Sequence, residues 1–285
     1  MALAVCASDA AAAAVVQSPQ NAFTPHRALY RMELGSTTQG SDINEASGTM
    51  FYRFEPQCDG WEVETRVAMR LHYGTGGTLE VVETTWTFTS FESYDGTRLT
   101  YAVDHRRNGE VQEAFAGEAG KDAGGGVASF NEDDLSSVEL PSGTLFPAEH
   151  LIGLLAHVRK SDAPFKQVVF DGASVDNPYE VNAIVIGPVR GGVVVADAPE
   201  HARLKPKNSV LVEASAASDT SRDLNVWRVR MAYFPQLSMT DLPDFELEVD
   251  YREDGIAERM IQDFGDFTLN LTPHRLEVLA KPECN

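Results

Sequence analysis

Residues 78–115 read TLEVVETTWTFTSFESYDGTRLTYAVDHRRNGEVQEAF, and this stretch decides the fold. The bulky apolar residues Val82, Trp86 and Phe88 share one parity, while threonine and charged residues occupy the other. Successive side chains of a β-strand point to opposite faces of the sheet. This period of two therefore predicts a strand with one apolar face and one polar face.

Two turn signals divide the same stretch into three strands. Asp95-Gly96 ends the first alternation, and Asn108-Gly109 ends the second. Both dipeptides suit type I′ hairpin turns, because the two central residues of such a turn need positive φ. The stretch is therefore predicted to form an antiparallel meander.

The same pattern recurs along the rest of the chain. Apolar alternations occur at residues 30–34, 50–54, 63–67, 168–170, 179–186, 227–233, 245–251, 261–264, 267–271 and 276–279. Further Asp-Gly turn signals stand at Asp59, Asp171 and Asp254, and the chain is expected to turn again at Gly187-Pro188. We predict an all-β fold with one main helix, in which a large antiparallel sheet curls into an open barrel or β-spiral.

The main helix is predicted at residues 147–160. Pro147 suits the first helical position, where its missing N–H costs nothing. Its predicted apolar stripe, at the spacing of one helix face, comprises Leu151, Leu154, Leu155 and Val158. We expect this stripe to cover the apolar face of the sheet. His150 and His157 are two turns apart rather than the four residues usual for helical zinc ligands, so packed or surface histidines are expected.

Three segments are predicted to be loops. The glycine-rich segment 117–126 lacks the Lys-Ser or Lys-Thr of a phosphate-binding loop, and we expect a flexible hairpin tip. The acidic run at 132–134 lacks the regular ligand spacing of a calcium loop, which favours a solvated surface. A long loop is expected at 191–217.

Composition restricts the possible partners. The 285 residues carry a formal net charge of −20 and give a pI near 4.6. Such a chain repels a phosphate backbone, so nucleic acid is excluded as a partner. No stretch approaches the roughly 20 apolar residues needed to span a bilayer. The length suits one large β domain, predicted at residues 23–285, and we expect a monomer.

Residues 1–22 are rich in alanine and contain no basic residue. A complete secretory signal has a basic beginning and a longer apolar run. We interpret the segment as a signal-peptide remnant, and the alternative is a disordered leader. Cys6 lies in this segment, which leaves Cys58 and Cys284 in the mature chain. These two either form a bridge that pins the C-terminal tail or remain unrelated free thiols.

Sequence signatures of catalysis are missing. The chain has no G-x-S-x-G, H-E-x-x-H, C-x-x-C or dinucleotide-binding motif. Carboxylates are plentiful, and a pair can assemble in space, but nothing distinguishes such a pair from a solvated acidic face, which is the favoured interpretation. We therefore predict no catalytic residue, no metal ligand and no cofactor.

Several short segments together resemble a known family. They are His26-Arg27-Ala28-Leu29-Tyr30, Cys58-Asp59-Gly60-Trp61, Ser90-Phe91-Glu92, Leu140-Pro141-Ser142-Gly143-Thr144-Leu145-Phe146-Pro147, Phe170-Asp171-Gly172, Ile184-Val185-Ile186-Gly187 and Asp263-Phe264-Gly265-Asp266-Phe267. In this order they resemble the EipB family of periplasmic cell-envelope integrity proteins from Gram-negative alphaproteobacteria. The resemblance extends from residue 26 to residue 284.

This resemblance implies a spiral-like, open antiparallel β-barrel, related in shape to lipoprotein-carrier half-barrels. It implies a disulfide, which maps onto Cys58 and Cys284, and it implies no catalytic residue. It also implies a role in envelope maintenance, with a periplasmic tetratricopeptide-repeat protein as a functional associate.

The sequence leaves three hypotheses for the function of the protein. The leading hypothesis is a periplasmic, non-enzymatic protein that maintains cell-envelope integrity through protein or lipid binding. The second is a lipid or lipoprotein carrier that uses the concave apolar face as its ligand site. The third is a hydrolase of an envelope polymer, which would be favoured by carboxylates clustered in a polar cleft.

Overall fold

The computed structural model describes residues 21–75, 78–131, 137–175, 177–190, 224–236 and 241–284. These ranges contain 14 strands and one helix, α1 (Pro147–Val158). The strands are β1 (His26–Thr37), β2 (Ile43–Pro56), β3 (Gly60–Thr75), β4 (Thr78–Ser93), β5 (Arg98–Arg107), β6 (Glu110–Asp122), β7 (Gly125–Phe130), β8 (Ser137–Leu140), β9 (Phe165–Val169), β10 (Tyr179–Val189), β11 (Val226–Pro235), β12 (Phe245–Arg252), β13 (Ala257–Asp263) and β14 (Phe267–Val278).

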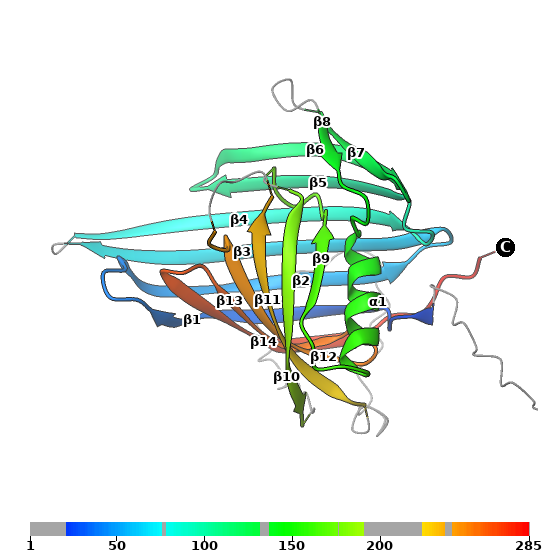
Figure 1. Ribbon diagram of the computed structural model, residues 1–285. Helices are drawn as coiled ribbons and strands as arrows, with labels where there is room; N and C mark the ends of the chain where they lie inside the picture. Colours follow the sequence, from blue (N-terminus) through cyan, green and yellow to red (C-terminus); the bar gives the residue numbers. More distant parts are fainter. Residues whose placement is uncertain are drawn as a thin grey trace, which may run out of the picture.

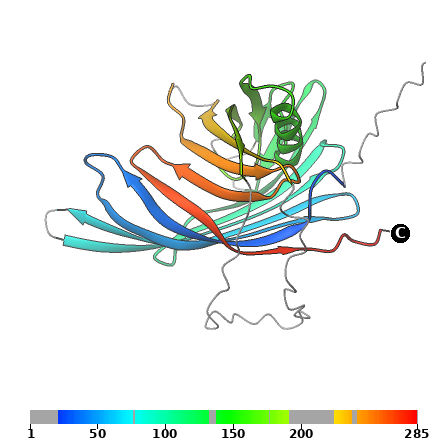
Figure 2. The ribbon, with the colours of Figure 1, turned by 90° about the horizontal axis from the view of Figure 1, so that it is seen from below.

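All 14 strands belong to one sheet, in the order β8-β7-β6-β5-β4-β3-β2-β1-β14-β13-β12-β11-β10-β9. Every strand pairs antiparallel with its neighbours, and β1 pairs with both β2 and β14. The long strands β1 to β6 form one layer, and β9 to β13 together with α1 are folded across its inner face (Figures 1 and 2). The sheet therefore curls around its own apolar face as a spiral.

The sheet is open, because β8 and β9 lie at its two ends. One isolated parallel bridge joins Leu145, which follows β8, to Val169 of β9. There the Leu145 N–H donates to the carbonyl of Val168 at 2.8 Å, and the Phe170 N–H donates to the carbonyl of Leu145 at 3.0 Å. The two edges thus meet at a single point, which confirms the predicted all-β class and the open barrel.

The alternation that predicted β4 separates its two faces as expected. Val82 and Phe88 are 2% and 7% exposed, whereas Val81 and Thr85 on the other parity are exposed. The inner parity of the strands fills three apolar clusters. The first lies beneath α1 and β9 to β12, the second lies among β4 to β8, and the third lies among β1 to β4 and β14.

Helix α1 covers the inner face as predicted. It begins at Pro147, and Leu154, Leu155 and Val158 are buried in the first cluster, while Leu151 is half-buried against it. The helix ends at Val158, two residues before the predicted end. Among the described residues, no helix is long and apolar enough to cross a membrane.

The turn predictions are only partly correct. Asn108 and Gly109 have φ values of 51° and 83°, as a type I′ turn requires. At Asp95-Gly96 only Gly96 has positive φ, so the type I′ prediction is wrong there. The Asp95 carboxylate instead accepts hydrogen bonds from the hydroxyls of Ser93 and Thr97 within a longer loop.

The predicted glycine-rich hairpin tip is correct only in part, because the turn of the β6–β7 hairpin is confined to residues 123–124. Residues 117–122 lie in β6, and β7 begins at Gly125. A Cβ at Gly117 would collide with the carbonyl oxygen of Ser129 and the ring of Tyr101. Here glycine permits close approach of backbone and side chain within the sheet, rather than flexibility.

Two strand boundaries differ from those predicted. β10 does not end at Gly187-Pro188 but continues to Val189 through a register shift, where Gly187 has a φ of 140°. The two predicted strands at 267–271 and 276–279 form the single strand β14, with a register shift beside Pro273. In both cases a bulge accommodates the proline. Residues 1–20, the acidic run at 132–134 and the loop at 191–217 lie outside the described residues.

Candidate functional site

The two cysteines of the described chain are joined. Cys58, in the turn between β2 and β3, forms a disulfide with Cys284 of the C-terminal tail, and their Cα atoms are 5.5 Å apart. The tail is also held at its beginning, because the Leu279 N–H donates to the carbonyl of Pro25 at 2.8 Å. The bridge therefore ties the end of the chain to an early hairpin.

Aromatic rings pack directly behind this bridge. Trp61 stacks on Phe54 with ring centroids 4.8 Å apart, and Phe23 and Tyr94 meet the edge of the Trp61 ring at 5.5 Å and 5.2 Å. Trp61 is 2% exposed and belongs to the cluster beneath α1. We call this part of the barrel the closed end. Its interior is filled by the side chains of the cluster beneath α1.

The other part of the inner face is less covered, and we call it the open end. Two cross-strand rows run over it. One row pairs Trp86 with Val67 and Val67 with Met50, and the second pairs Thr84 with Met69 and Met69 with Gly48. The hairpins that carry these residues extend past the part covered by α1 (Figure 2).

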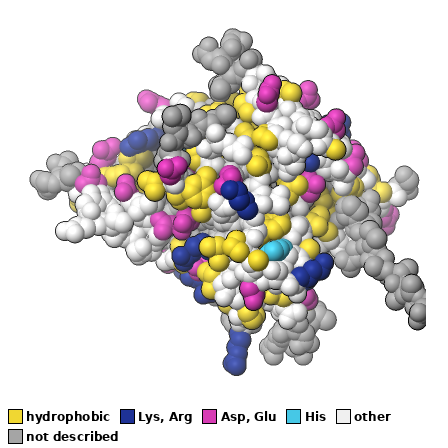
Figure 3. Space-filling view, viewed as in Figure 1, with side chains coloured by type: hydrophobic (Ala, Val, Ile, Leu, Met, Phe, Trp, Pro, Cys, Tyr) yellow, Lys and Arg dark blue, Asp and Glu magenta, His cyan; other side chains and the backbone are white. Residues whose placement is uncertain are grey.

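Methionines are concentrated in this region. We define the concave stripe as the six side chains Met32, Met50, Val67, Met69, Trp86 and Met260. The register connects Met260 to Met32 through Leu271 of β14. Met32 and Met50 are 2% and 9% exposed and form the floor, while the other four are half-buried. Hydrophobic side chains reach the surface over the long strands on this side of the molecule (Figure 3).

Such a stripe is suited to an apolar ligand. Methionine is flexible and polarisable, so it adapts to irregular apolar shapes. Ligand sites are mostly apolar and carry a few polar groups that fix orientation. Here the polar group is the pair Thr84 and His105, whose Oγ1 and Nε2 atoms lie 3.0 Å apart.

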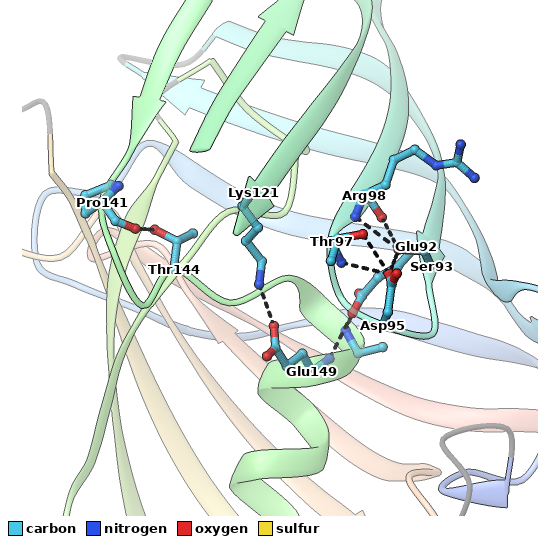
Figure 4. A network of polar contacts seen from close by, with 10 residues as sticks. Glu92, Ser93, Asp95, Thr97, Arg98, Lys121, Pro141, Thr144 and Glu149 are labelled. Carbon is cyan, nitrogen blue, oxygen red and sulfur yellow. Dashed lines mark hydrogen bonds and ion pairs between the residues drawn. The ribbon is translucent and has the colours of Figure 1, made fainter. Parts of the chain in front are cut away.

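A polar junction connects α1 to β4 and β6 (Figure 4). The Glu92 carboxylate of β4 accepts hydrogen bonds from the backbone N–H groups of Ala148, at 2.6 Å, and Glu149, at 3.0 Å. The residue before the helix, Phe146, provides no side-chain cap, so Glu92 caps α1 from a distant strand. Lys121 forms an ion pair with Glu149 at 2.9 Å.

Burial controls the chemistry of Glu92. Loss of solvent raises the pKa of this carboxyl to about 7, and the hydrogen bonds from the two helix amides act in the opposite direction. A raised pKa is typical of a general acid, but both oxygens of Glu92 are already occupied by the helix amides. Its geometry is that of a structural cap.

An open pocket of about 340 Å³ lies beside this junction. Its polar lining is largely hydrogen bonded internally. The Ser142 hydroxyl donates to the carbonyl of Ala123 at 2.9 Å, and the Thr144 hydroxyl donates to the carbonyl of Pro141 at 2.7 Å. Because few lining groups remain to meet a ligand, we regard the concave stripe as the better candidate site.

The helix histidines are packed or bonded, as expected. Burial lowers the pKa of His150 to about 4, and its ring lies against Phe165 with centroids 5.7 Å apart. The Nε2 atom of His157 lies 2.7 Å from the carbonyl of Ala163. Within the described ranges, no three His, Cys, Asp or Glu side chains are grouped to hold a metal ion.

Sequence reasoning missed the Glu92 cap, and it proposed the concave apolar face as a ligand site without identifying the residues of the stripe. Glu92 lies far from α1 in the sequence, and no local motif signals a cap supplied by another element. The concave stripe had a usable signal, because Met50 and Met69 lie on the apolar parity of neighbouring strands. That parity does not indicate which part of the face remains uncovered.

Comparisons with known proteins agree with this architecture. The cell envelope integrity protein EipB of Brucella abortus is 23% identical over 249 residues, which cover 87% of this chain and 81% of the Brucella protein. A crystal structure of a β-barrel-like protein from Brucella abortus superposes with a TM-score of 0.75 at 23% identity. That match covers 90% of this chain and 99% of the crystallised chain. The family model described as EipB-like matches residues 17–280, so this chain belongs to the EipB-like family.

Proposed function

We propose that this protein maintains cell-envelope integrity as a periplasmic, non-enzymatic factor that binds an apolar chain on its concave stripe. The envelope role is supported by family membership and by the name of the Brucella relative. The binding role is supported by one observation above all: four large apolar side chains of the stripe, Val67, Met69, Trp86 and Met260, are only half-buried on the inner face of the sheet.

A periplasmic location is supported by the alanine-rich leader and by the disulfide, since disulfides persist in oxidising compartments. A non-enzymatic role is supported by the occupied hydrogen bonds of Glu92 and of the neighbouring pocket. We further propose, from the family resemblance, a periplasmic tetratricopeptide-repeat protein as a functional associate. The apolar ligand on this view is a lipid or the acyl chain of a lipoprotein.

A paired substitution on one strand tests the binding role. Met69→Glu places a charge on the concave stripe, whereas Ala68→Glu places the same charge on the outer face of β3, where Ala68 is exposed. Protein purified from the periplasm is analysed by native mass spectrometry for bound lipid. In parallel, each variant is expressed in a strain that lacks the gene, and growth is measured with a membrane-active detergent.

We expect bound lipid and detergent resistance with the wild type and with Ala68→Glu, and loss of both with Met69→Glu. Equal rescue by Met69→Glu in a correctly folded form would contradict the role of the stripe. Loss of rescue with Glu92→Gln alone, accompanied by loss of a soluble polymer fragment, would favour the hydrolase hypothesis instead.

A further inference from the structure

A strip of hydroxyl groups lies between the closed end and the concave stripe. Tyr52 follows Met50 by two residues on β2 and stands directly opposite Thr65 of β3, so both project to the inner face. Ser90 of β4 lies on the same face, diagonal to Thr65. The fourth hydroxyl comes from the layer folded across this face, where Tyr251 of β12 packs against the cluster beneath α1 (Figure 2). We define the hydroxyl strip as these four side chains, Tyr52, Thr65, Ser90 and Tyr251.

The hydroxyls of this strip lack the partners that other tyrosines of the inner face have. The Tyr30 hydroxyl donates to the carbonyl of Ala257 at 2.8 Å, and the Tyr101 hydroxyl donates to the carbonyl of Ser129 at 2.9 Å. Within the described ranges, none of the four strip hydroxyls forms a hydrogen bond with another side chain or with the backbone. Hydroxyls inside proteins normally find partners, so the strip has unused capacity for hydrogen bonds.

The strip is enclosed by the two layers but is not sealed. Thr65 and Ser90 are 9% and 8% exposed, while Tyr52 and Tyr251 are half-buried. Valine, alanine and phenylalanine would occupy similar volumes without placing an unpaired hydroxyl in an apolar interior, which is unfavourable. Packing alone therefore does not account for these hydroxyls, whereas a bound polar group would supply their missing partners.

The hydroxyl strip is uncharged and contains no counter-ion. Burial raises the pKa of Tyr251 to about 12, so this hydroxyl remains a neutral donor and acceptor at physiological pH. Burial also raises the pKa of Tyr52, and an ionised Tyr251 would raise it further, so the two side chains lie close together. The row of Tyr52 and Thr65 continues to Ala28 on one side and to Phe88 on the other. This row therefore offers no cation to an anionic group.

The ionisable groups around the strip do not favour a charged ligand either. The ring of His26 lies 5.6 Å from that of Tyr52, and burial lowers the pKa of His26, which keeps it neutral. Burial raises the pKa of Tyr30, and the charges of an ionised Tyr251 and of Glu258 would raise it further. Glu258 thus opposes an anion on this side of the barrel. It also has a partner within the protein, so it does not serve as a counter-ion for a cationic group.

We infer that the ligand has an uncharged, oxygen-rich head, the glycerol ester of an acylglycerol, which lies on the hydroxyl strip while the acyl chain lies on the concave stripe. Ester carbonyls accept hydrogen bonds, and glycerol hydroxyls both donate and accept them, which matches the strip. Along β2 and β3 the strip is two residues, or about 7 Å, from the concave stripe, so one molecule spans both. This inference rests on the proposed function, because it uses the same stripe, and it adds the chemistry of the head group.

The experiment compares three single-chain probes of equal chain length below their critical micelle concentrations. They are an uncharged monoacylglycerol, an anionic fatty acid and a cationic alkylammonium, and binding to the intact protein is measured by calorimetry. Four near-isosteric variants each remove one hydroxyl of the strip: Tyr52→Phe, Thr65→Val, Ser90→Ala and Tyr251→Phe. The control is Tyr101→Phe, which removes an inner-face hydroxyl that already has a backbone partner.

We expect the wild type to bind the monoacylglycerol about tenfold more tightly than either charged probe, the gain that one or two hydrogen bonds give. Tyr52→Phe and Tyr251→Phe should each weaken this binding about threefold to tenfold, because each removes one hydrogen bond to the head group. Neither variant should change the binding of the charged probes. Tyr101→Phe should lower the denaturation midpoint and leave every affinity unchanged.

A free lipid and a lipoprotein both present this glycerol ester, and a competition experiment distinguishes them. A short peptide with an N-terminal diacylglyceryl group and a free diacylglycerol are each used to displace the monoacylglycerol. Stronger displacement by the peptide assigns the ester to a lipoprotein, and stronger displacement by the diacylglycerol assigns it to a free lipid. Either order supports the inferred head group.

The other outcomes separate the inference from the proposed function. If all three probes bind equally and the phenylalanine variants have no effect, the head-group inference is wrong while the apolar binding role stands. If these variants lose stability but keep their affinity for the monoacylglycerol, the hydroxyls serve only the folded structure and the inference is again wrong. If no probe binds, the proposed function fails together with the inference.

Discussion

The closed and open ends of the barrel are built from the same strands but serve different purposes. At the closed end, Phe54 and Trp61 lie beneath α1 and are 5% and 2% exposed. At the open end, Val67 and Met69 of the same strand β3 are half-buried. Both pairs of residues lie on the apolar side of the same alternating pattern. The pattern therefore determines which face of the sheet is apolar, but not which part of that face is buried. The element that covers each part decides whether it becomes core or candidate site.

The disulfide is expected to make the largest contribution to the stability of the closed end. It spans a separation of 226 residues, for which the chain-entropy model gives about 5 kcal/mol as an upper value. Cys58→Ser and Cys284→Ser should each lower the free energy of unfolding and increase protease cleavage near the C-terminus. Chemical denaturation and limited proteolysis measure these effects.

The double substitution should be no more destabilising than either single one, because each single change already breaks the bridge. Thiol labelling of denatured, non-reduced protein freshly isolated from cells gives the independent check. Two free thiols there would show that the bridge does not form in the cell.

Shortening a buried side chain of α1, the helix that covers the inner face, should have the second largest effect on stability. Leu154 is 0% exposed in the cluster beneath α1, so Leu154→Ala should cost about 2–5 kcal/mol of unfolding free energy. Ile152 of the same helix is 36% exposed, and Ile152→Ala serves as the matched control with little change expected. Equal denaturation midpoints for the two variants would mean that α1 does not close this end.

The Glu92 cap of α1 should make the stability of the folded protein depend on pH. Burial raises the pKa of Glu92 from 4.5 to about 7, so the folded protein holds this proton more tightly than the unfolded chain. The resulting stabilisation is complete below pH 4.5 and is lost as the pH rises through about 7, a change on the order of 1–3 kcal/mol.

Urea unfolding at several pH values tests this cap. Glu92→Gln should lose the decrease in stability between about pH 5 and pH 8 that the wild type shows through Glu92. Glu139→Gln, a change at an exposed carboxyl of β8, is the control and should keep the wild-type profile. An identical profile for wild type and Glu92→Gln would mean that Glu92 is not buried against the helix.

The smallest expected effect on stability comes from a comparison of two valines of the inner face, each replaced by alanine. Val229 is 0% exposed beneath α1, and Val229→Ala should cost about 2 kcal/mol, since it removes buried methyl groups and leaves a cavity. Val67→Ala at the open end should cost less, about 1 kcal/mol, because Val67 is only half-buried in the folded protein. Similar losses at both positions would remove the distinction between the two ends.

The sequence predicted the elements of this fold better than the way they assemble. Val82 and Phe88 lie on the buried face that their spacing indicated, and Leu154 lies in the core. The register of Asn108-Gly109 was also readable, because a type I′ turn depends on those two residues alone. Each of these features is set by local chemistry.

Features that depend on distant residues were not readable. The cap that Glu92 gives to α1 joins residues 56 positions apart, and no local pattern encodes it. Gly117 looked like part of a flexible tip, yet its lack of a side chain serves close packing against Ser129 and Tyr101. The open end of the inner face likewise depends on where α1 and β9 to β13 are folded across the sheet.

The pairing of β1 with β14 has a consequence for the order of folding. His26 stands opposite Val278, so a contact near the middle of the sheet joins the first strand to the last. A chain that is synthesised from its N-terminus can complete the meander from β1 to β8 before β14 is available. That first meander must then wait with the β1 edge unpaired, and free edges promote aggregation. Long-range pairing of this kind folds slowly. Protection of the β1 edge until β14 is available is therefore a requirement that this topology places on the cell.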